Sequence, residues 1–185
     1  MGTHTVCILK PLPKPLKGPE NMDFRKKIRI GVIGGSRPRP ESIELAREVG
    51  ELIARNGAVL VCGGLGGVME GAARGAKKAG GLTIGILPGN EPTDANSQID
   101  IPIATGMGFS RNSLVAMNAD ALIAVDGEFG TLSEIAFGCI YGKEVIGLGT
   151  WEVKGVVPAG APEEAVRLAL SSVRKKRKGT GRAKL

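Results

Sequence analysis

Short apolar segments alternate with segments of helical periodicity along most of this chain, and this alternation limits the possible folds more than any other feature. Apolar stretches of strand length occupy residues 28–34, 58–62, 82–87, 101–104, 121–125 and 144–148. Segments with helical character occupy residues 41–55, 68–79, 110–118, 132–141 and 162–173. Apolar strands separated by helices are typical of a parallel sheet that is covered on both faces. The sequence therefore predicts an α/β fold, with a Rossmann-like, doubly wound, mostly parallel sheet and helices on both faces.

The composition predicts an aliphatic core and glycine-rich turns. Hydrophobic residues make up 42% of the chain, but aromatic residues make up only 3%. The 29 glycines gather at the ends of the predicted strands and not in a low-complexity tract. Glycine permits the tight turns and the close ligand approach that α/β folds use at the carboxyl ends of their strands.

The net charge of +7 is unevenly distributed along the chain. Residues 30–173 contain 16 acidic and 11 basic residues, whereas residues 174–185 contain seven basic residues and no acidic ones. We therefore expect a Pro/Lys-rich N-terminal arm at 1–27, a Rossmann-like domain at 28–173 and a basic C-terminal tail at 174–185. A solvated tail is favoured over a nucleic-acid-binding arm, because no aromatic residues interleave the basic ones.

Cysteine and histidine usage excludes several kinds of site. The three cysteines are widely spaced without a CxxC pair, so the sequence predicts neither a disulfide framework nor a zinc site. His4 is the only histidine and lies in the N-terminal arm, so histidine triads are excluded from the domain. Acid–base work there falls to Asp, Glu, Lys or Tyr141. No apolar run approaches the ~18 residues of a membrane span, and we expect a cytoplasmic protein with no metal site and no cofactor.

Three glycine-rich turns follow predicted strands and are candidates for ligand contact. They are Gly34-Gly35-Ser36, Gly63-Gly64-Leu65-Gly66-Gly67 and Gly127-Glu128-Phe129-Gly130-Thr131. None matches the P-loop, and the second turn lacks the third glycine of a dinucleotide fingerprint. A single glycine turn usually only connects a strand to a helix. Three such turns at one edge of a sheet favour ligand contact, because the N–H groups at helix starts bind anions such as phosphate.

Arg111 and Glu134 are the candidate catalytic residues. Arg111 stands at the start of the predicted helix 110–118, where a cation is mildly unfavourable unless an anion lies nearby. Glu134 stands in the first turn of the next predicted helix, and Thr131, three residues before it, gives the spacing of a capping box. The residues alone leave two interpretations open. Either Glu134 faces a ligand together with Arg111, or it caps its own helix.

Taken together, these motifs resemble the LOG (Lonely Guy) family of nucleoside 5′-monophosphate phosphoribohydrolases. The resemblance covers about residues 29–150. The segments that carry it are GVIGGSR (31–37), VCGGLGGVMEGAARGA (61–76) and GFSRNSLVAMNADALIAVDGEFGTLSE (108–134). The last two correspond to the GGGxGxMEAA-like and PGGxGTxxE hallmarks of the family. Asp126 stands where the second hallmark has proline, and Glu128 stands where it has its second glycine.

The resemblance implies hydrolysis of an N-glycosidic bond in a nucleoside 5′-monophosphate, which releases a free base and ribose 5-phosphate. It assigns Arg111 and Glu134 as the catalytic pair. The substrate and phosphate contacts that it implies are Gly34, Gly35, Ser36, Gly63, Gly64, Gly66, Gly67, Glu70, Gly127, Gly130 and Thr131. The alternative is a non-catalytic binder, because LOG-like proteins with the same GGSR start resemble molybdenum-cofactor carriers. The family also implies a homodimer or higher homo-oligomer, and we expect neither a nucleic acid nor a membrane as partner.

Overall fold

All seven strands of the central sheet run parallel, in the order β4-β3-β2-β1-β5-β6-β7. The computed structural model describes residues 23–181. The strands are β1 (Arg29–Gly34), β2 (Val59–Cys62), β3 (Thr83–Leu87), β4 (Ile101–Ala104), β5 (Ala121–Val125), β6 (Glu144–Leu148) and β7 (Val156–Pro158). The chain steps outward from β1 to β4, returns to the centre, and then steps outward on the other side from β5 to β7. The predicted doubly wound, Rossmann-like fold is confirmed.

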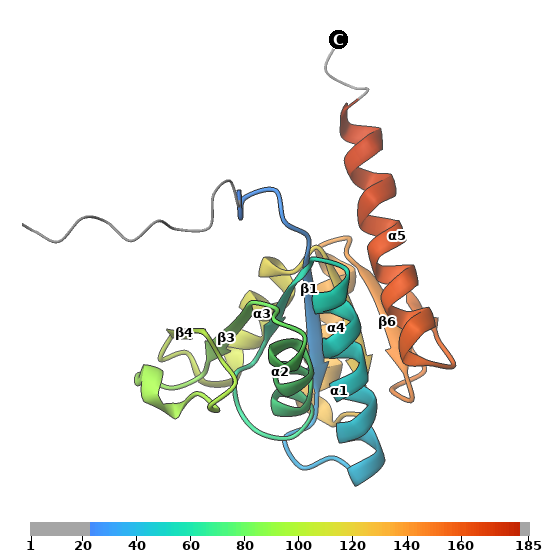
Figure 1. Ribbon diagram of the computed structural model, residues 1–185. Coiled ribbons are helices and arrows are strands. Elements are labelled where there is room, and N and C mark those ends of the chain that lie inside the picture. The colour runs from blue at the N-terminus through green and yellow to red at the C-terminus, as the bar shows by residue number, and fades with distance from the viewer. Residues whose placement is uncertain (1–22, 182–185) are drawn as a thin grey trace, which may run out of the picture.

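Helices cover both faces of this sheet, as Figure 1 shows. One face carries α1 (Pro40–Arg55), α2 (Val68–Lys78) and α5 (Pro162–Gly181), and the other carries α3 (Asn112–Asn118) and α4 (Phe129–Ile140). The 3-10 helices η1 (Pro92–Asp94) and η2 (Gly108–Arg111) lie in connections. Each face has its own core of buried Val, Ile, Leu and Ala, as the composition predicts.

Small residues bring α1 and α2 into close contact. A Cβ on Gly75 would overlap the carbonyl oxygen of Arg47, and a Cβ on Gly50 would overlap that of Ala72. The small residues of α2 are buried against α1 of the same chain and therefore do not form a surface between subunits.

The structure differs from the predicted boundaries in three places. α4 begins at Phe129, earlier than the expected residue 132, and the three-residue β7 is too short to show a pattern in the sequence. α5 continues to Gly181, past the expected end near residue 173. Lys and Arg are good helix formers, and positive charge is favourable at a helix C-terminus, so the basic segment extends the helix. The predicted N-terminal arm lies outside the described residues except for 23–27.

The strand order reverses between β1 and β5, which are neighbours in space although far apart in sequence. Ligands of open α/β sheets bind at such a switch point, because the loops that leave the two strands diverge there. The last residues of the two strands, Gly34 and Val125, pair in register. A Cβ on Gly34 would overlap the carbonyl oxygen of Val125, so glycine is required for the two loops to begin side by side.

The helices of residues 23–181 include none that is both long and apolar enough to cross a membrane.

Candidate functional site

A cleft of about 370 Å³ opens at the carboxyl ends of the central strands, at the switch point. Its lining combines glycines from two loops, several apolar side chains and a small group of polar residues. These residues are Gly34, Gly35, Ser36, Leu65, Met69, Pro88, Gly108, Phe109, Arg111, Asn112, Glu128, Gly130, Thr131 and Glu134.

Arg111 is the last residue of η2 and lies almost fully buried in this cleft. Its Nη2 donates a hydrogen bond to the carbonyl oxygen of Gly63 at 3.2 Å, and its Nη1 donates to Oδ1 of Asn112. Nη1 also lies 3.6 Å from Oε1 of Glu134. Burial lowers the pKa of Arg111, while the carboxyl of Glu134 opposes this change. Groups from the β2 loop, α3 and α4 thus fix the guanidinium in one orientation.

Glu134 lies in α4 with only 7% of its side chain exposed, and it lines the cleft beside Arg111. Burial raises the pKa of its carboxyl to about 8, although the nearby guanidinium acts in the opposite direction. The capping-box interpretation is wrong, because α4 begins at Phe129 and makes no side-chain hydrogen bond at its N-cap. Thr131 lies inside the helix and not at its start. The structure therefore agrees with the other interpretation, in which Glu134 faces the cleft.

Asn112 joins the helices that carry the two candidate residues. Its Nδ2 donates to Oγ of Ser133 at 2.9 Å and to the carbonyl oxygen of Gly130 at 3.3 Å. Its Oδ1 accepts the hydrogen bond from Arg111. One buried amide therefore positions both the guanidinium and the first turn of α4.

Two buried polar atoms at the cleft have no hydrogen-bond partner among the described residues, namely Nε of Arg111 and Oγ1 of Thr131. Buried polar groups are nearly always paired, and an unpaired one costs about 1–3 kcal/mol. Both atoms belong to residues that line the cleft. Their position supports the interpretation that this cleft receives a polar ligand.

Asp126, which stands in place of the family's proline, turns its carboxylate away from the cleft. Its Oδ2 accepts a hydrogen bond from Oγ of Ser42 at 2.8 Å and lies 3.7 Å from Nε of Arg39, at the start of α1. The hydrogen bond from Ser42 is the main reason that the pKa of Asp126 is lowered. Asp126 has a φ of 53°, a left-handed conformation that is uncommon outside glycine, asparagine and aspartate. Its charge is thus compensated by α1 and does not face a ligand.

Glu128, the other departure from the family motif, lies differently. Its side chain is exposed, and the residue lines the mouth of the cleft as the N-cap of α4. A carboxylate at a helix start is favourable for the helix but repels a second anion. Glu128 therefore repels an anion at the mouth of the cleft.

The cleft brings together seven of the predicted site residues, and the other six lie outside its lining. Those in the lining are Gly34, Gly35, Ser36, Arg111, Gly130, Thr131 and Glu134. Those outside it are Gly63, Gly64, Gly66, Gly67, Glu70 and Gly127.

Several of the outer residues shape the cleft indirectly. Gly67 has a φ of 69°, and a Cβ there would overlap the carbonyl oxygen of Gly35, so it lets α2 begin beneath the first glycine turn. Gly127 has a φ of 122° and packs against Thr131. Glu70 instead pairs with Arg74, one turn further along α2, at 2.9 Å.

Several lining residues were not predicted from the sequence, namely Leu65, Met69, Pro88, Gly108, Phe109 and Asn112, and Glu128 was noted only as a departure from the family motif. The position of Asn112 next to Arg111 was the one available signal.

Within residues 23–181, no three potential metal ligands among His, Cys, Asp and Glu come together.

Comparisons with known proteins agree with this architecture. The model of the SLOG cluster4 family matches residues 27–175. An uncharacterised protein from Archaeoglobus fulgidus is 47% identical over 148 residues, which are 80% of this chain and 97% of that protein. The structure of the molybdenum cofactor binding protein from Rippkaea orientalis is similar with a TM-score of 0.76 and 38% identity, over 80% of this chain and 98% of that chain.

A cytokinin riboside 5′-monophosphate phosphoribohydrolase from Mycobacterium tuberculosis is also similar, over a shorter region. It is 38% identical over 101 residues, which are 51% of this chain and 52% of that protein. The resemblance to the LOG family is therefore confirmed, and because the family model extends over most of its length, the chain belongs to the SLOG cluster4 family.

Proposed function

We propose that this protein binds a phosphorylated heterocycle of the molybdenum-cofactor type in the switch-point cleft and carries it without chemical change. The observation that supports this function best is the lining of the cleft. It combines backbone amides, which can bind an anion, with apolar side chains. The similarity to a molybdenum cofactor binding protein over 98% of that chain supports the same choice.

The polar end of the cleft suits a phosphate group. The turn at Gly34, Gly35 and Ser36 and the first turn of α4 at Gly130 and Thr131 line it from two sides. Backbone N–H groups at a helix start carry partial positive charge and bind anions. A Cβ on Gly35 or Gly130 would meet no atom closer than 3.9 Å, and without a side chain a ligand can approach their backbone closely.

The apolar lining of the cleft suits a flat heterocycle. Leu65, Met69 and Pro88 provide apolar contact surface, and Phe109 lies at the rim with 86% of its surface exposed. An aromatic side chain in that position offers a stacking surface worth about 1 kcal/mol beyond simple burial. A phenylalanine side chain this exposed buries almost no apolar surface on folding, so its position favours a role in ligand contact.

The protonation of Glu134 argues against hydrolysis as the main function. Stabilisation of a positively charged sugar in the transition state requires a carboxylate. Burial raises the pKa of the Glu134 carboxyl to about 8, which disfavours the charged form that this role needs.

Phosphoribohydrolase activity is the second candidate, and the contact of Arg111 with Glu134 at 3.6 Å favours it. A protonated Glu134 has the right state to donate a proton to a departing base. The relative from Mycobacterium tuberculosis that carries this activity is matched over about half its length.

We also propose that the protein forms a homo-oligomer through the outer face of α4. Phe129 and Ile140 are 79% and 73% exposed, and eleven residues of helix place them on the same side. Exposed Ala136 lies between them on that side, and Met117 of the neighbouring α3 is 49% exposed. An apolar stripe of this kind is typical of a protein contact surface.

A turnover assay distinguishes carrier from hydrolase. Incubation with adenosine, guanosine, cytidine and uridine 5′-monophosphates is expected to release no free base above the level without protein. Molybdenum cofactor released from a denatured molybdoenzyme is expected to co-elute with the protein in gel filtration, detected by pterin fluorescence. Phe109→Ala should weaken this binding about threefold to tenfold through lost stacking, whereas Arg167→Gln on α5 should not change it. Release of base that disappears in Glu134→Gln would establish the hydrolase instead.

The raised pKa of Glu134 predicts a pH-dependent effect of Glu134→Gln on stability. The folded state holds the proton up to about pH 8, whereas the unfolded chain loses it near 4.5, so stability falls as pH rises through this window. Each pH unit there changes the free energy of unfolding by up to about 1.4 kcal/mol. The Tm advantage of the variant should therefore grow from pH 5 to pH 8. Glu152→Gln, on an exposed loop, is the control, and a constant Tm difference across this range would contradict the account.

Ile140→Lys is expected to break the oligomer, because it places a charge in the apolar stripe of α4. Multi-angle light scattering at micromolar concentration should give a dimer or larger assembly for the unchanged protein and a monomer for this variant. Val153→Lys changes an apolar residue that is 37% exposed outside α4 and should leave the assembly intact. A monomeric unchanged protein would refute the proposal.

A further inference from the structure

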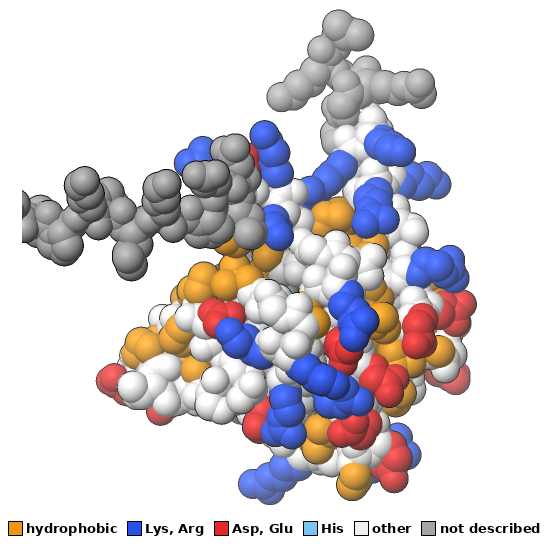
Figure 2. All heavy atoms as spheres, viewed as in Figure 1, with side chains coloured by type: hydrophobic (Ala, Val, Ile, Leu, Met, Phe, Trp, Pro, Cys, Tyr) orange, Lys and Arg blue, Asp and Glu red, His pale blue; other side chains and the backbone are white. Residues whose placement is uncertain are grey.

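The end of the molecule opposite to the cleft is strongly basic. The last turns of α5 carry Arg174, Lys175, Lys176, Arg177 and Lys178, and the segment before β1 carries Arg25, Lys26 and Lys27. We call these eight residues the basic pole. Figure 2 shows blue side chains gathered at the top of the molecule, and Figure 1 shows that β1 runs from this end toward the loop that begins α1. The basic pole therefore lies at the amino ends of the strands, far from the cleft at their carboxyl ends.

Arg177 joins the two segments of the basic pole into one surface. Its Nη1 donates to the carbonyl oxygen of Lys26 at 2.7 Å, and its Nη2 donates to that of Lys27 at 3.2 Å. Nη2 also lies 3.0 Å from Oδ2 of Asp120. Asp23, an acidic residue in the segment before β1, is 3.4 Å from Nζ of Lys26. These two carboxylates offset only part of the positive charge.

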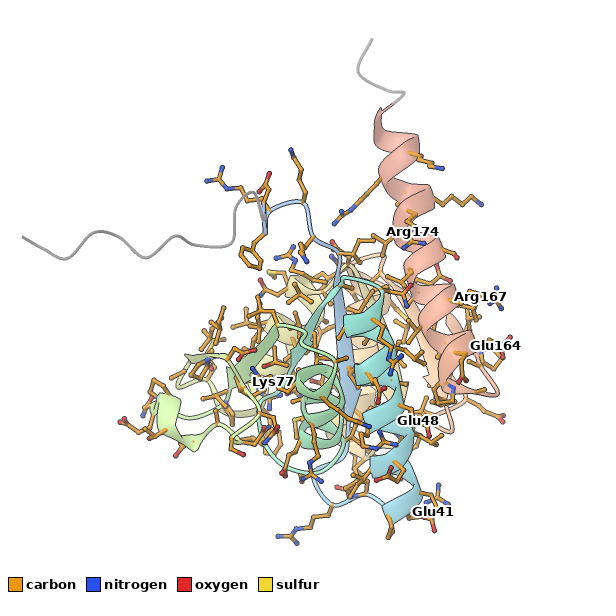
Figure 3. The ribbon with its side chains drawn as sticks, viewed as in Figure 1. Glu41, Glu48, Lys77, Glu164, Arg167 and Arg174 are labelled. Atoms are coloured by element: carbon orange, nitrogen blue, oxygen red, sulfur yellow. The ribbon has the colours of Figure 1, made fainter. Side chains whose placement is uncertain are left out.

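The helix carries its charges on several sides. Figure 3 shows Glu164, Arg167 and Arg174 in succession along α5, and beyond Arg174 the helix projects from the body of the protein. Residues 174–178 are all exposed. Successive residues of a helix differ by about 100° in direction, so the five cations point to several sides. Two of them contact the body: Nζ of Lys176 donates to the carbonyl oxygen of Gly142 at 2.6 Å, and Arg177 donates to those of Lys26 and Lys27. Like charges three and four residues apart, such as Arg174 and Lys178, repel each other, and an anionic partner would relieve this repulsion.

We propose that the basic pole binds the phosphate backbone of double-stranded nucleic acid, independently of sequence. An α-helix with its side chains is about 10–12 Å across, and the major groove of DNA is about 12 Å wide. Residues 174–178 hold only Lys and Arg, whose positive charges suit contact with phosphate oxygens. Phosphate contacts therefore supply the affinity, and they carry no sequence information.

Two observations favour a nucleic acid over a membrane surface. The exposed last turns of α5 lack apolar residues, which a helix needs in order to lie in the interface of a bilayer. The excess of acidic residues in 30–173 repels a polyanion from the rest of the molecule and directs it to the basic pole. The segment that was expected to be a solvated tail is helical as far as Gly181, and the proposal differs from the expectation that nucleic acid is not a partner.

Fluorescence anisotropy of the full-length protein with a labelled DNA duplex of about 20 base pairs tests this proposal. Contact with four or five phosphates predicts that the logarithm of the binding constant falls with the logarithm of salt concentration with a slope of about −4. The triple change Arg174→Gln, Lys175→Gln and Lys178→Gln should weaken binding at least tenfold at about 100 mM salt and reduce the slope by about 3. Gln is a good helix former, so α5 is expected to persist, which circular dichroism checks.

The control variant carries Lys78→Gln, Lys154→Gln and Arg167→Gln. These changes also remove three positive charges, but at positions outside the basic pole. It should keep the slope of the unchanged protein, and a duplex of scrambled sequence should bind with the same affinity. Phosphatidylglycerol vesicles should not bind at the same salt concentration. The proposal is overturned by absence of duplex binding at about 50 mM salt, by equal weakening in both triple variants, or by binding to vesicles in place of the duplex.

Discussion

The contact between the guanidinium of Arg111 and the carboxyl of Glu134 is the interaction on which the candidate site depends. Both side chains are more than nine-tenths buried, and removal of charge from water is costly unless partners compensate for it. The carbonyl oxygen of Gly63 and the amide of Asn112 supply that compensation for Arg111. Within residues 23–181, Glu134 accepts no such hydrogen bond, and burial raises the pKa of its carboxyl although the guanidinium of Arg111 opposes this change. The fold thus holds a carboxyl of raised pKa beside a fixed cation at the point where ligands of α/β sheets bind.

The fold and the two central site residues follow from the sequence, because their signals are local. Apolar strands and glycine turns define the sheet edge, and the strand β5 between Arg111 and Glu134 carries the chain back to that edge. The capping-box spacing at Thr131 was misleading, because spacing alone does not show that the helix already begins at Phe129. Leu65, Met69 and Pro88 were missed because their approach to the cleft depends on how the loops pack. The basic segment was expected to be a tail, because a run of charged residues shows no helical spacing of apolar residues. Its Lys and Arg residues instead extend α5.

The charge distribution divides the molecule into two ends with different properties. At the carboxyl ends of the strands, the exposed Glu128 limits the positive character of the cleft, and the lining combines backbone amides with apolar side chains. At the amino ends, the basic pole is held together by Arg177 and Asp120 and does not share a residue with the cleft. A polyanion at one end therefore leaves the other end open to a small ligand.

A crystal structure of the complex with the molybdenum cofactor tests the central claim most directly. The account predicts phosphate oxygens about 3 Å from backbone amides in the turn at Gly35 or in the first turn of α4. It also predicts that the heterocycle lies against Phe109 and Met69, with Arg111 and Glu134 beside it. Ligand density outside the switch-point cleft, or a Glu134 side chain that has left Arg111 to pack elsewhere in its own helix, would contradict it.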